Sequence, residues 1–527
     1  MQKTLFTLLL ILTLGSVLPA EEGQQDKNRP NVVFILSDDQ SWDSFGFMGG
    51  KVHTPRLNQM AKDGLYLRNF NVTSTVCSPS RYSFLTGRYA GRCEGQRFMR
   101  EHPPGDQTQV ENIGELETDR WNLAKVLQKN GYYTGFVGKS HVVRHDWIHP
   151  RKNNDAAMKV NWSIDADPRD PKINTLMREH HQRWCNEIKK YGFSFVDGVY
   201  GANLKELHNK ALNVHNLDWT IDKTMKFLDS VDDKPFFLCV STTLHHGPAP
   251  WIDKNALQAD PRMTGEGFIE RGFNVLPTRD DVLKRNREAG FKDRAAYALW
   301  LDDGVGAIID KIKELGLSEE TMIVFSPDHG AYRHGKTTLY DFGMRVPMLC
   351  LWPGTIEPGL ENNEIIANID FAPTVMDICG VKPPQDYRFD GMSFKAALND
   401  DPTPLREVLL GELGHARCVK TKDWKYIAIR YPAKIQALIA RGHKFNAYKD
   451  NAGLDLPYLT RNLHLGHFAA KSNPNYFATD QLYDLNSDPD EVHNIAYKHP
   501  EVVEMLKQKL AKELRQFAGR PFGEFTE

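Results

Sequence analysis

Four short apolar runs along the chain each lead into a cluster of polar, chemically reactive side chains. The runs do not alternate between apolar and polar positions, so they predict strands that are buried on both faces. Such strands are typical of parallel or mixed sheets that are covered by helices. The runs and the polar segments that follow them are 32–36 with 37–39, 133–137 with 138–141, 236–240 with 245–248, and 322–325 with 326–330.

Helical patterns lie between these runs, most clearly from Ala295 to Leu315, where apolar residues recur at spacings of three and four. Strands that alternate with helices predict an α/β fold, here a mixed central sheet sandwiched by helices. Ligands of such sheets bind beyond the carboxyl ends of the strands, which is where all four polar clusters fall. Any single cluster is more simply explained as a loop that caps a strand, but the four together predict a common pocket.

The pattern changes after about residue 400. Short strands with polar turns are predicted within 418–429 and at 481–485, and residues 501–517 have the apolar spacing of an amphipathic helix. A chain of 527 residues is long enough for two packed parts, because single hydrophobic cores stop growing at about 250 to 300 residues. We therefore expect a large domain over residues 28–400 and a smaller α+β subdomain over residues 401–527.

The beginning of the chain differs from the rest. Lys3 precedes an apolar run over residues 5–18, which is followed by Pro19, Ala20 and a polar stretch. This is the layout of a secretory signal peptide. A membrane anchor is the rival interpretation, but crossing a bilayer takes about 20 apolar residues, and no second long apolar run follows. We expect a signal peptide over residues 1–20, export to the periplasm or the medium, and no stable membrane anchor.

Composition and charge narrow the function classes without choosing an activity. Hydrophobic residues make up 41% and charged residues 25% of the chain, which are the averages of globular proteins. A formal net charge of -2 provides no basic field for binding nucleic acid. The seven cysteines are odd in number and lack the Cys-x-x-Cys spacing of zinc or redox sites. At least one therefore has no disulfide partner, and most are expected to be small buried hydrophobes.

The most specific motif lies between residues 76 and 88. Cys77, Pro79 and Arg81 are spaced as Cys-x-Pro-x-Arg, and Leu-Thr-Gly-Arg follows at 85–88. The first half alone is expected by chance in many proteins, in which the cysteine is an ordinary buried residue before a helix. The second half at this spacing makes the whole segment resemble the signature of the formylglycine-dependent, arylsulfatase-like sulfatases.

The resemblance extends over nearly the whole chain. It implies the alkaline phosphatase-like fold of this family, a catalytic domain over residues 28–400, and hydrolysis of a sulfuric ester. The other matching segments are Asp38-Asp39, Gly138-Lys139-Ser140-His141, Ser326-Pro327-Asp328-His329-Gly330, Lys336 with 340–347, 482–485 and 488–491.

The resemblance also implies two cofactors. In the family the cysteine, here Cys77, is oxidised to a formylglycine (3-oxoalanine) by a formylglycine-generating enzyme or an anaerobic sulfatase-maturating enzyme. The family binds one divalent cation, usually Ca2+, for which carboxylates are suitable hard oxygen ligands. Many members carry asparagine where this chain has His329, whose ring nitrogen is a softer ligand. The implied metal ligands are Asp38, Asp39, Cys77 in its oxidised form, Asp328 and His329.

Sulfate-ester cleavage accumulates negative charge on the sulfate oxygens and the departing oxygen, so cations and hydrogen-bond donors are needed there. By resemblance, Arg81, Lys139 and Lys336 supply positive charge around the nucleophile. One hydroxyl of the hydrated formylglycine attacks sulfur with Asp328 as base, and the other then expels sulfate with His141 as proton acceptor. A serine has no second hydroxyl and would remain sulfated, which explains why an aldehyde is made.

The departing alcohol needs a proton from a general acid. The resemblance places this role on the histidine before Gly-Pro in the third cluster, which is His246, with the neighbouring His245 as the alternative. Histidine suits proton transfer because its unperturbed pKa of about 6.5 lies close to working pH. The alternative is that the two histidines have no catalytic role and are a solvated pair in a loop.

Two other hypotheses remain. A phosphomonoester or phosphonate-ester hydrolase of the same superfamily would accept a substrate of the same tetrahedral shape. A phosphate dianion favours a second metal, however, and the sequence offers ligands for only one. A non-catalytic binding protein would keep the pocket but never receive the oxidation at residue 77.

Export favours a sulfated carbohydrate or a small organic sulfate ester as the substrate. The residues that bind its organic part are expected in variable loops, within 144–178 and 433–479. These loops contain no pattern from which the alcohol can be identified.

Overall fold

The computed structural model describes residues 29–110, 113–143, 160–248, 256–331, 335–401, 403–431, 433–442 and 473–525. The predicted signal peptide lies outside these ranges. So do 144–159 and 443–472, which are parts of the two loops expected to bind the organic part of the substrate. Within the described ranges, no helix is long and apolar enough to cross a membrane.

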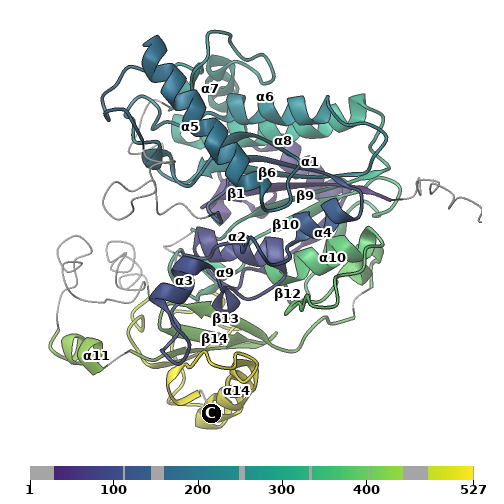
Figure 1. Ribbon diagram of the computed structural model, residues 1–527. Helices are drawn as coiled ribbons and strands as arrows, with labels where there is room; N and C mark the ends of the chain where they lie inside the picture. Colours follow the sequence, from purple (N-terminus) through teal and green to yellow (C-terminus); the bar gives the residue numbers. More distant parts are fainter. Residues whose placement is uncertain are drawn as a thin grey trace, which may run out of the picture.

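A mixed sheet of eight strands forms the centre of the molecule, in the order β11-β2-β10-β9-β1-β6-β4-β5 (Figure 1). β1 runs parallel to β6 and β9, and β4 runs parallel to β5 and β6, while β10 is antiparallel to β9 and β2. The four predicted strands are the neighbours β9, β1, β6 and β4, so the predicted mixed sheet is confirmed. The strands are β1 Asn31–Asp38, β2 Leu65–Leu67, β4 Tyr133–Lys139, β5 Phe195–Tyr200, β6 Phe236–His245, β9 Thr321–Pro327, β10 Met348–Leu351 and β11 Leu360–Asn362.

Helices cover both faces of this sheet, because alternate side chains of each strand point to opposite sides. Val33 and Ile35 of β1 pack with α1, α6, α7 and α8, whereas Val32 and Phe34 pack with α2, α4 and α10. Figure 1 shows these two helical layers above and below the strands. The helix predicted over 295–315 is α8. The layers consist of α1 Pro55–Asp63, α6 Leu217–Leu228, α7 Arg279–Glu288 and α8 Ala296–Glu314, and of α2 Cys77–Thr86, α4 Leu123–Lys129 and α10 Phe371–Ile378.

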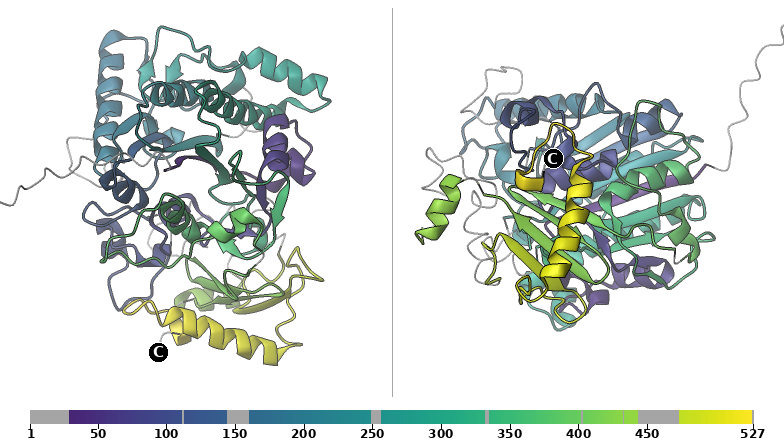
Figure 2. Two further views of the ribbon diagram at one scale, coloured as in Figure 1. Left: turned by 90° about the vertical axis from the view of Figure 1, so that its right-hand side faces the viewer. Right: turned by 90° about the horizontal axis from the view of Figure 1, so that it is seen from below.

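A second sheet of four antiparallel strands follows in the order β13-β14-β15-β16, with helix α14 packed against it (Figure 2). The predicted α+β character of this part is confirmed, although 418–429 contains two strands joined by a turn. Its hydrophobic core also includes Val76, Leu339 and Met344, so the two parts share one core. The elements are β13 Leu409–Leu413, β14 Ala416–Lys420, β15 Trp424–Ile429, β16 Asp480–Asp484 and α14 Pro500–Leu514.

All seven cysteines lie in the described ranges, are buried, and form no disulfide. The prediction that most of them are small buried hydrophobes is therefore confirmed. The other helices and strands are β3 Phe70–Asn71, β7 Met263–Thr264, β8 Gly267–Phe268, β12 Ile366–Ala367, α3 Gln96–Glu101, α5 Pro171–Lys189, α9 Asp341–Met344 and α11 Ala433–Ala440.

Candidate active site

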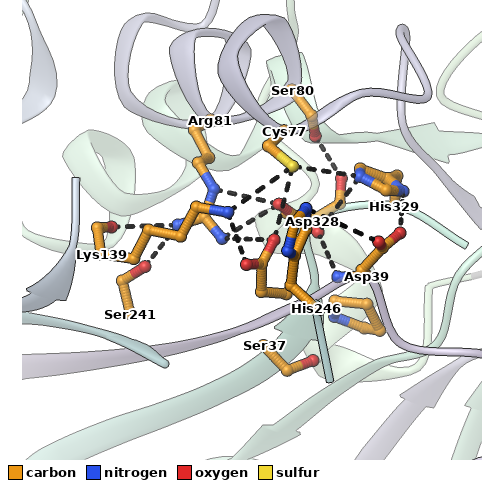
Figure 3. A network of polar contacts seen from close by, with 12 residues as sticks. Ser37, Asp39, Cys77, Ser80, Arg81, Lys139, Ser241, His246, Asp328 and His329 are labelled. Atoms are coloured by element: carbon orange, nitrogen blue, oxygen red, sulfur yellow. Dashed lines mark hydrogen bonds and ion pairs between the residues drawn. The ribbon is translucent and has the colours of Figure 1, made fainter. Parts of the chain in front are cut away.

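Four neighbouring parallel strands deliver the predicted polar segments to one edge of the central sheet. Asp38 is the last residue of β1, Lys139 is the last residue of β4, and Asp328 directly follows β9. Figure 3 shows Lys139 and Asp328 converging with Cys77 and Arg81 of helix α2. The ends of the strands and the start of one helix therefore form a single cluster of charged side chains.

Cys77 lies at the centre of this cluster as the first residue of α2, with a side chain that is 2% exposed. Its Sγ lies 3.4 Å from Asp38 Oδ1 and 3.5 Å from His329 Nε2. The Nζ atoms of Lys139 and Lys336 lie 3.8 Å and 3.9 Å from the same sulfur. Burial raises the pKa of the thiol well above its ordinary value in spite of the two lysines. The unmodified residue is therefore a neutral thiol, which is a weak nucleophile.

Each carboxylate of the cluster has a cationic partner. Burial opposes the ionisation of Asp38, but Lys139 holds its pKa well below the usual range. Burial likewise opposes the ionisation of Asp39, but Lys336, His329 and His246 together lower its pKa to about 2. Three carboxylates this close together would repel one another strongly, and three cations offset that repulsion. The pairs are Lys139 Nζ with Asp38 Oδ2 at 2.5 Å, Lys336 Nζ with Asp39 Oδ2 at 2.7 Å, and Arg81 Nε with Asp328 Oδ2 at 3.0 Å.

The same residues offer donor atoms that fit a divalent cation. Ligand atoms of Cys77, Asp328 and His329 lie within 4.8 Å of one another. Oδ1 of Asp39 is buried and accepts no hydrogen bond within the described part of the chain, so it can serve as a ligand. His329 Nδ1 lies 3.2 Å from the carbonyl oxygen of Gly330, which can only accept, so Nδ1 carries the proton. The lone pair of Nε2 is then free to face Cys77 and Asp328.

Two further side chains position the cations, and sequence reasoning missed both. Lys139 Nζ donates a hydrogen bond to Asn203 Oδ1 at 2.9 Å. The guanidinium of Arg81 donates to the Ser241 hydroxyl and, at 3.1 Å, to the carbonyl of Lys139. The position of Ser241, directly after the predicted apolar run 236–240, could have indicated it, whereas no motif marks Asn203.

The predicted general acid and its neighbour have different surroundings. His246 is partly exposed, and its Nε2 lies 4.0 Å from Asp39 Oδ2. Burial, Lys336 and Lys139 lower the pKa of His246 to about 3. His245 is the last residue of β6, and burial lowers its pKa to about 4. Its Nε2 has no hydrogen-bond partner among the described residues. Of the two, His246 is the one that reaches the charged cluster.

A buried histidine on the segment before α6 holds the loop that carries His246. The Nε2 of His215 lies 2.8 Å from the carbonyl oxygen of His246 and 3.0 Å from that of Pro248, and its Nδ1 lies 2.8 Å from Thr243 Oγ1. Burial lowers the pKa of His215 to about 4. Because carbonyl oxygens only accept, neutral His215 is protonated on Nε2. Its signal in the sequence was weak, since it is one polar residue among several in 213–216.

His141 lies two residues beyond Lys139, after the end of β4. It is buried, has a φ of 52°, and donates its backbone N–H to the carbonyl of Gly201 at 2.9 Å. The structure thus places His141 at the same strand end as Lys139, and its role as a proton acceptor stays a prediction.

Comparison with known sequences gives a consistent result. Residues 30–381 match the family model described as sulfatase, and residues 328–440 match the C-terminal model of N-sulphoglucosamine sulphohydrolase. Arylsulfatase G of Canis lupus familiaris is 27% identical over 454 residues, which cover 82% of this chain and 81% of the relative. The N-acetylglucosamine-6-O-sulfatase of Bacteroides thetaiotaomicron is 23% identical and covers 96% of this chain and 90% of its own.

Solved structures share the fold. A protein described under the metabolism of multiple glycosaminoglycans by Bacteroides thetaiotaomicron superposes with a TM-score of 0.62 at 20% identity, covering 92% of this chain and 99% of its own. A phosphonate monoester hydrolase of Agrobacterium radiobacter superposes with a TM-score of 0.57 at 18% identity, covering 93% and 96%. The sulfatase model spans well over half of the sequence, and its range includes the residues that meet at the charged cluster. The chain therefore belongs to the sulfatase family of hydrolases.

Proposed function

We propose that this sulfatase releases inorganic sulfate from a sulfated carbohydrate, with a formylglycine made from Cys77 as the nucleophile and one Ca2+ ion as cofactor. The observation that carries the proposal is the setting of Cys77. Its buried sulfur has two lysine ammonium groups and two potential metal ligands within 4 Å, at the start of a helix. A helix N-terminus and two cations together favour a negatively charged group at this position.

The high pKa of the Cys77 thiol supports a modified nucleophile. At neutral pH the thiol is protonated, so the unmodified site holds a poor nucleophile among groups that favour an anion. When the thiol is replaced by a hydrated aldehyde, residue 77 supplies one hydroxyl to attack sulfur and a second to expel sulfate.

Lys139, Lys336 and Arg81 bind and orient the sulfate group. Lys139 and Lys336 lie almost equally far from the Cys77 sulfur, so a sulfate next to residue 77 would meet two ammonium groups. Arg81 is 2% exposed and holds Asp328 through its guanidinium. Such fixed cations stabilise charge that develops on the sulfate oxygens without having to reorganise during the reaction.

Asp38, Asp39, Asp328 and His329 would hold the cation together with residue 77. When bound, Ca2+ supplies positive charge close to the sulfate oxygens and favours the deprotonated form of the nucleophile. Asp328 is the proposed base for that deprotonation. The unpartnered oxygen of Asp39 and the free lone pair of His329 support this assignment.

His246 is the proposed general acid for the departing alcohol, and His141 the proposed acceptor of the later proton. In the free site the pKa of His246 is lowered to about 3 by burial and by the two lysines. A bound sulfate ester brings a negative charge beside those lysines, which opposes their effect and raises the pKa of His246. Substrate binding therefore favours the protonated form of His246 that the proposed role needs.

A phosphonate or phosphate ester hydrolase is the alternative, and the fold neighbour from Agrobacterium radiobacter makes it concrete. Three cations balance three carboxylates in the cluster. One divalent ion would then leave a net charge of about +2, which falls to about +1 when the nucleophile is deprotonated. That charge suits a sulfate ester with one negative charge better than a phosphate ester with about two.

The proposal is tested by comparing 4-nitrophenyl sulfate with 4-nitrophenyl phosphate as substrates of the matured protein. We expect kcat/KM to be higher for the sulfate ester, and a clear preference for phosphate would overturn the sulfatase assignment. The matched control is Cys77→Ser, which keeps one hydroxyl and should become sulfated once without turning over.

We further propose that the chain is exported and then acts on extracellular or periplasmic material, and that residues 28–400 and 401–527 form its catalytic domain and C-terminal subdomain. Residues 1–20 have the pattern of a signal peptide, which supports export. The relative from Bacteroides thetaiotaomicron is named for a sulfated sugar, which supports a carbohydrate substrate. A formylglycine-generating or anaerobic sulfatase-maturating enzyme would be the required partner.

A further inference from the structure

A pocket of about 460 Å3 lies beside the active site, and Trp42, Tyr66, Arg68, Arg345 and Asn363 are among the residues that line it. We call it the arginine pocket. Its volume is within the range of about 300 to 1,000 Å3 that is usual for small-molecule sites. Its walls come from β2, from the segments that follow β1, β2 and β11, and from the segment that precedes β10.

The register of the strands places this pocket at the same sheet edge as the charged cluster. β10 is antiparallel to both β9 and β2, with Leu349 opposite Phe325 and Met348 opposite Leu67. The start of β10 and the ends of β2 and β9 therefore meet at one edge. Arg345 precedes β10, just as Asp328 follows β9.

The wall of the pocket is also packed against the loop that carries the active-site residues. Trp42 lies three residues beyond Asp39, and its ring centroid is 5.4 Å from that of Phe342 in α9. The backbone N–H of Gly330 donates to the carbonyl of Gly343 at 2.9 Å. A Cβ added at Gly335 would lie 2.2 Å from the carbonyl carbon of Phe342, so only glycine fits there. Helix α9 thus packs both against Trp42 of the pocket and against Gly330 and Gly335, on either side of the undescribed residues 332–334.

Arg345 carries a positive charge that its neighbours do not balance. Its Nε lies 3.7 Å from Asp341 Oδ2, but Asp341 also accepts hydrogen bonds from Lys420 and Lys425. Lys425 pairs in turn with Glu491 at 2.9 Å. In this buried group the positive charges of the two lysines balance the negative charges of the two carboxylates. The positive charge of Arg345 is therefore not balanced by this group.

The second arginine is only weakly paired. Arg68 forms an ion pair with Glu361 at 2.7 Å, in which both side chains are more than half exposed, and such pairs contribute little. None of the described residues that line the arginine pocket is acidic. The pocket therefore has a positive potential with no carboxylate of its own.

The arginine side chains lie over aromatic rings. Arg345 Cζ is 4.4 Å from the ring centroid of Trp42, whose Nε1 donates to the Arg345 carbonyl at 2.6 Å. Arg68 Cζ is 5.8 Å from the ring centroid of Tyr66. Stacking on a ring fixes the plane of a guanidinium and directs its edge toward the parallel hydrogen bonds that sulfate and carboxylate groups accept, although part of the edge of Arg68 is used by Glu361.

We propose that the arginine pocket binds an anionic group, a sulfate ester or a carboxylate, on a sugar unit next to the one that loses its sulfate. This inference rests on the proposed function and makes the substrate a saccharide chain with at least two charged units. The aromatic rings contact the sugar, and the guanidinium groups contact its charge.

The test measures binding by calorimetry to the full chain with Cys77→Ala, which prevents turnover. The probes are hexasaccharides of κ-carrageenan (sulfate only), oligogalacturonate (carboxylate only), chondroitin sulfate (both) and cellulose (neither). The affinity of each probe is measured for this protein alone, for the same protein with Arg345→Gln, and for the same protein with the matched control Arg287→Gln. Arg287 lies on α7 and forms an exposed ion pair with Asp293. The control therefore also removes one positive charge, but at a site away from the pocket.

We expect Arg345→Gln to weaken binding of at least one anionic hexasaccharide by about tenfold or more, because a charged hydrogen-bonding partner is lost. Arg345→Lys should restore part of the affinity, and Arg287→Gln should change it by less than about twofold. The carrageenan and oligogalacturonate arms distinguish sulfate from carboxylate recognition.

The proposal is overturned if no anionic hexasaccharide loses more affinity with Arg345→Gln than with Arg287→Gln, or if the neutral cellulose hexasaccharide loses as much. Thermal melting of each variant checks that it is folded. Failure of the proposed function would appear separately, as a wild-type chain that releases no sulfate from any ester, and the binding result would stand without it.

Discussion

At the residue scale, the ammonium group of Lys139 donates hydrogen bonds to two acceptors, and only one of them belongs to a sequence motif. Asp38 is the motif residue, and Asn203 Oδ1 accepts the second hydrogen bond at 2.9 Å. Lys139 is fully buried, so the loss of either partner leaves a charged group less well satisfied in a dry site.

We predict that Asn203→Ala lowers kcat/KM for sulfate esters by about ten- to a hundredfold, since a hydrogen bond to a charged group contributes about 1.5 to 3 kcal/mol. Steady-state sulfate release measures this change. Asn186→Ala, which truncates an exposed asparagine on α5, should leave kcat/KM unaltered. Equal activity of the two variants would contradict the positioning role of Asn203.

The sequence was informative at this scale only where a motif or a resemblance existed. Cys77, Arg81 and Lys336 were predicted from motif spacing, and the structure brings all three into one cluster. Asn203 and His215 were not predicted, because their importance comes from tertiary contacts. A single asparagine or histidine in a polar loop looks the same in the sequence whether or not it touches a catalytic group.

At the scale of elements, a carboxylate from another helix accepts hydrogen bonds from the first turn of helix α1. Asp302 of α8 is buried and accepts the backbone N–H groups of Arg56 and Leu57 at 2.9 Å and 2.7 Å. Burial nevertheless raises the pKa of Asp302 from 3.8 to about 7. The folded protein therefore binds a proton here that the unfolded chain releases at lower pH.

We predict that this titration makes the protein less stable as the pH rises from about 4 to about 7. A carboxyl whose pKa is higher in the folded state stabilises that state only while it is protonated. Asp302→Asn removes the titration, so the wild type should lose up to roughly 4 kcal/mol of unfolding free energy relative to the variant across this range. Urea unfolding at several pH values measures the difference.

The control for this prediction is Glu314→Gln, which removes an exposed carboxylate from the same helix. Its stability should follow the wild-type pH dependence. A difference between wild type and Asp302→Asn that stays constant from pH 4 to pH 7 would show that the carboxylate does not titrate in this window.

The C-terminal sheet is joined to α9 by the buried group of Asp341, Lys420, Lys425 and Glu491. Lys425 is fully buried and contacts both carboxylates. We predict that Lys425→Met destabilises the protein by about 3 to 5 kcal/mol, because it leaves buried carboxylate charge without its partner. Lys422→Met, in the exposed turn between β14 and β15, is the matched control and should change stability by less than about 0.5 kcal/mol.

Chemical denaturation of the two variants decides this point. A loss no larger than that of Lys422→Met would mean that the buried group is not needed to join the sheet to α9. A large loss for Lys425→Met alone would support the role of the C-terminal part in holding the loop that follows Lys336.

At the scale of the whole molecule, the long apolar runs predicted the centre of the fold and the short ones did not. β1, β4, β6 and β9 could be predicted because each is a continuous apolar run in a sheet buried on both faces. β2, β10 and β11 contain only three or four residues, too few for a pattern to be recognised. The order of the strands could not be predicted at all, because it depends on contacts between distant segments.

The shared core explains why two predicted parts form one molecule. Val76, next to Cys77, packs in the same hydrophobic cluster as Leu410 and Tyr426 of the C-terminal sheet. The nucleophile's helix therefore begins on an interface between the two parts. Sequence patterns alone placed a boundary near residue 400 but gave no sign of this contact.

The central claim is that residue 77 acts as an oxidised nucleophile in a sulfate-ester hydrolase. The most direct test is the mass of the tryptic peptide Asn69–Arg81 from protein isolated from the organism that makes it. We predict the mass of the formylglycine form, which reacts with a hydrazine and resists thiol alkylation. A peptide found only as the alkylatable thiol would contradict the mechanism.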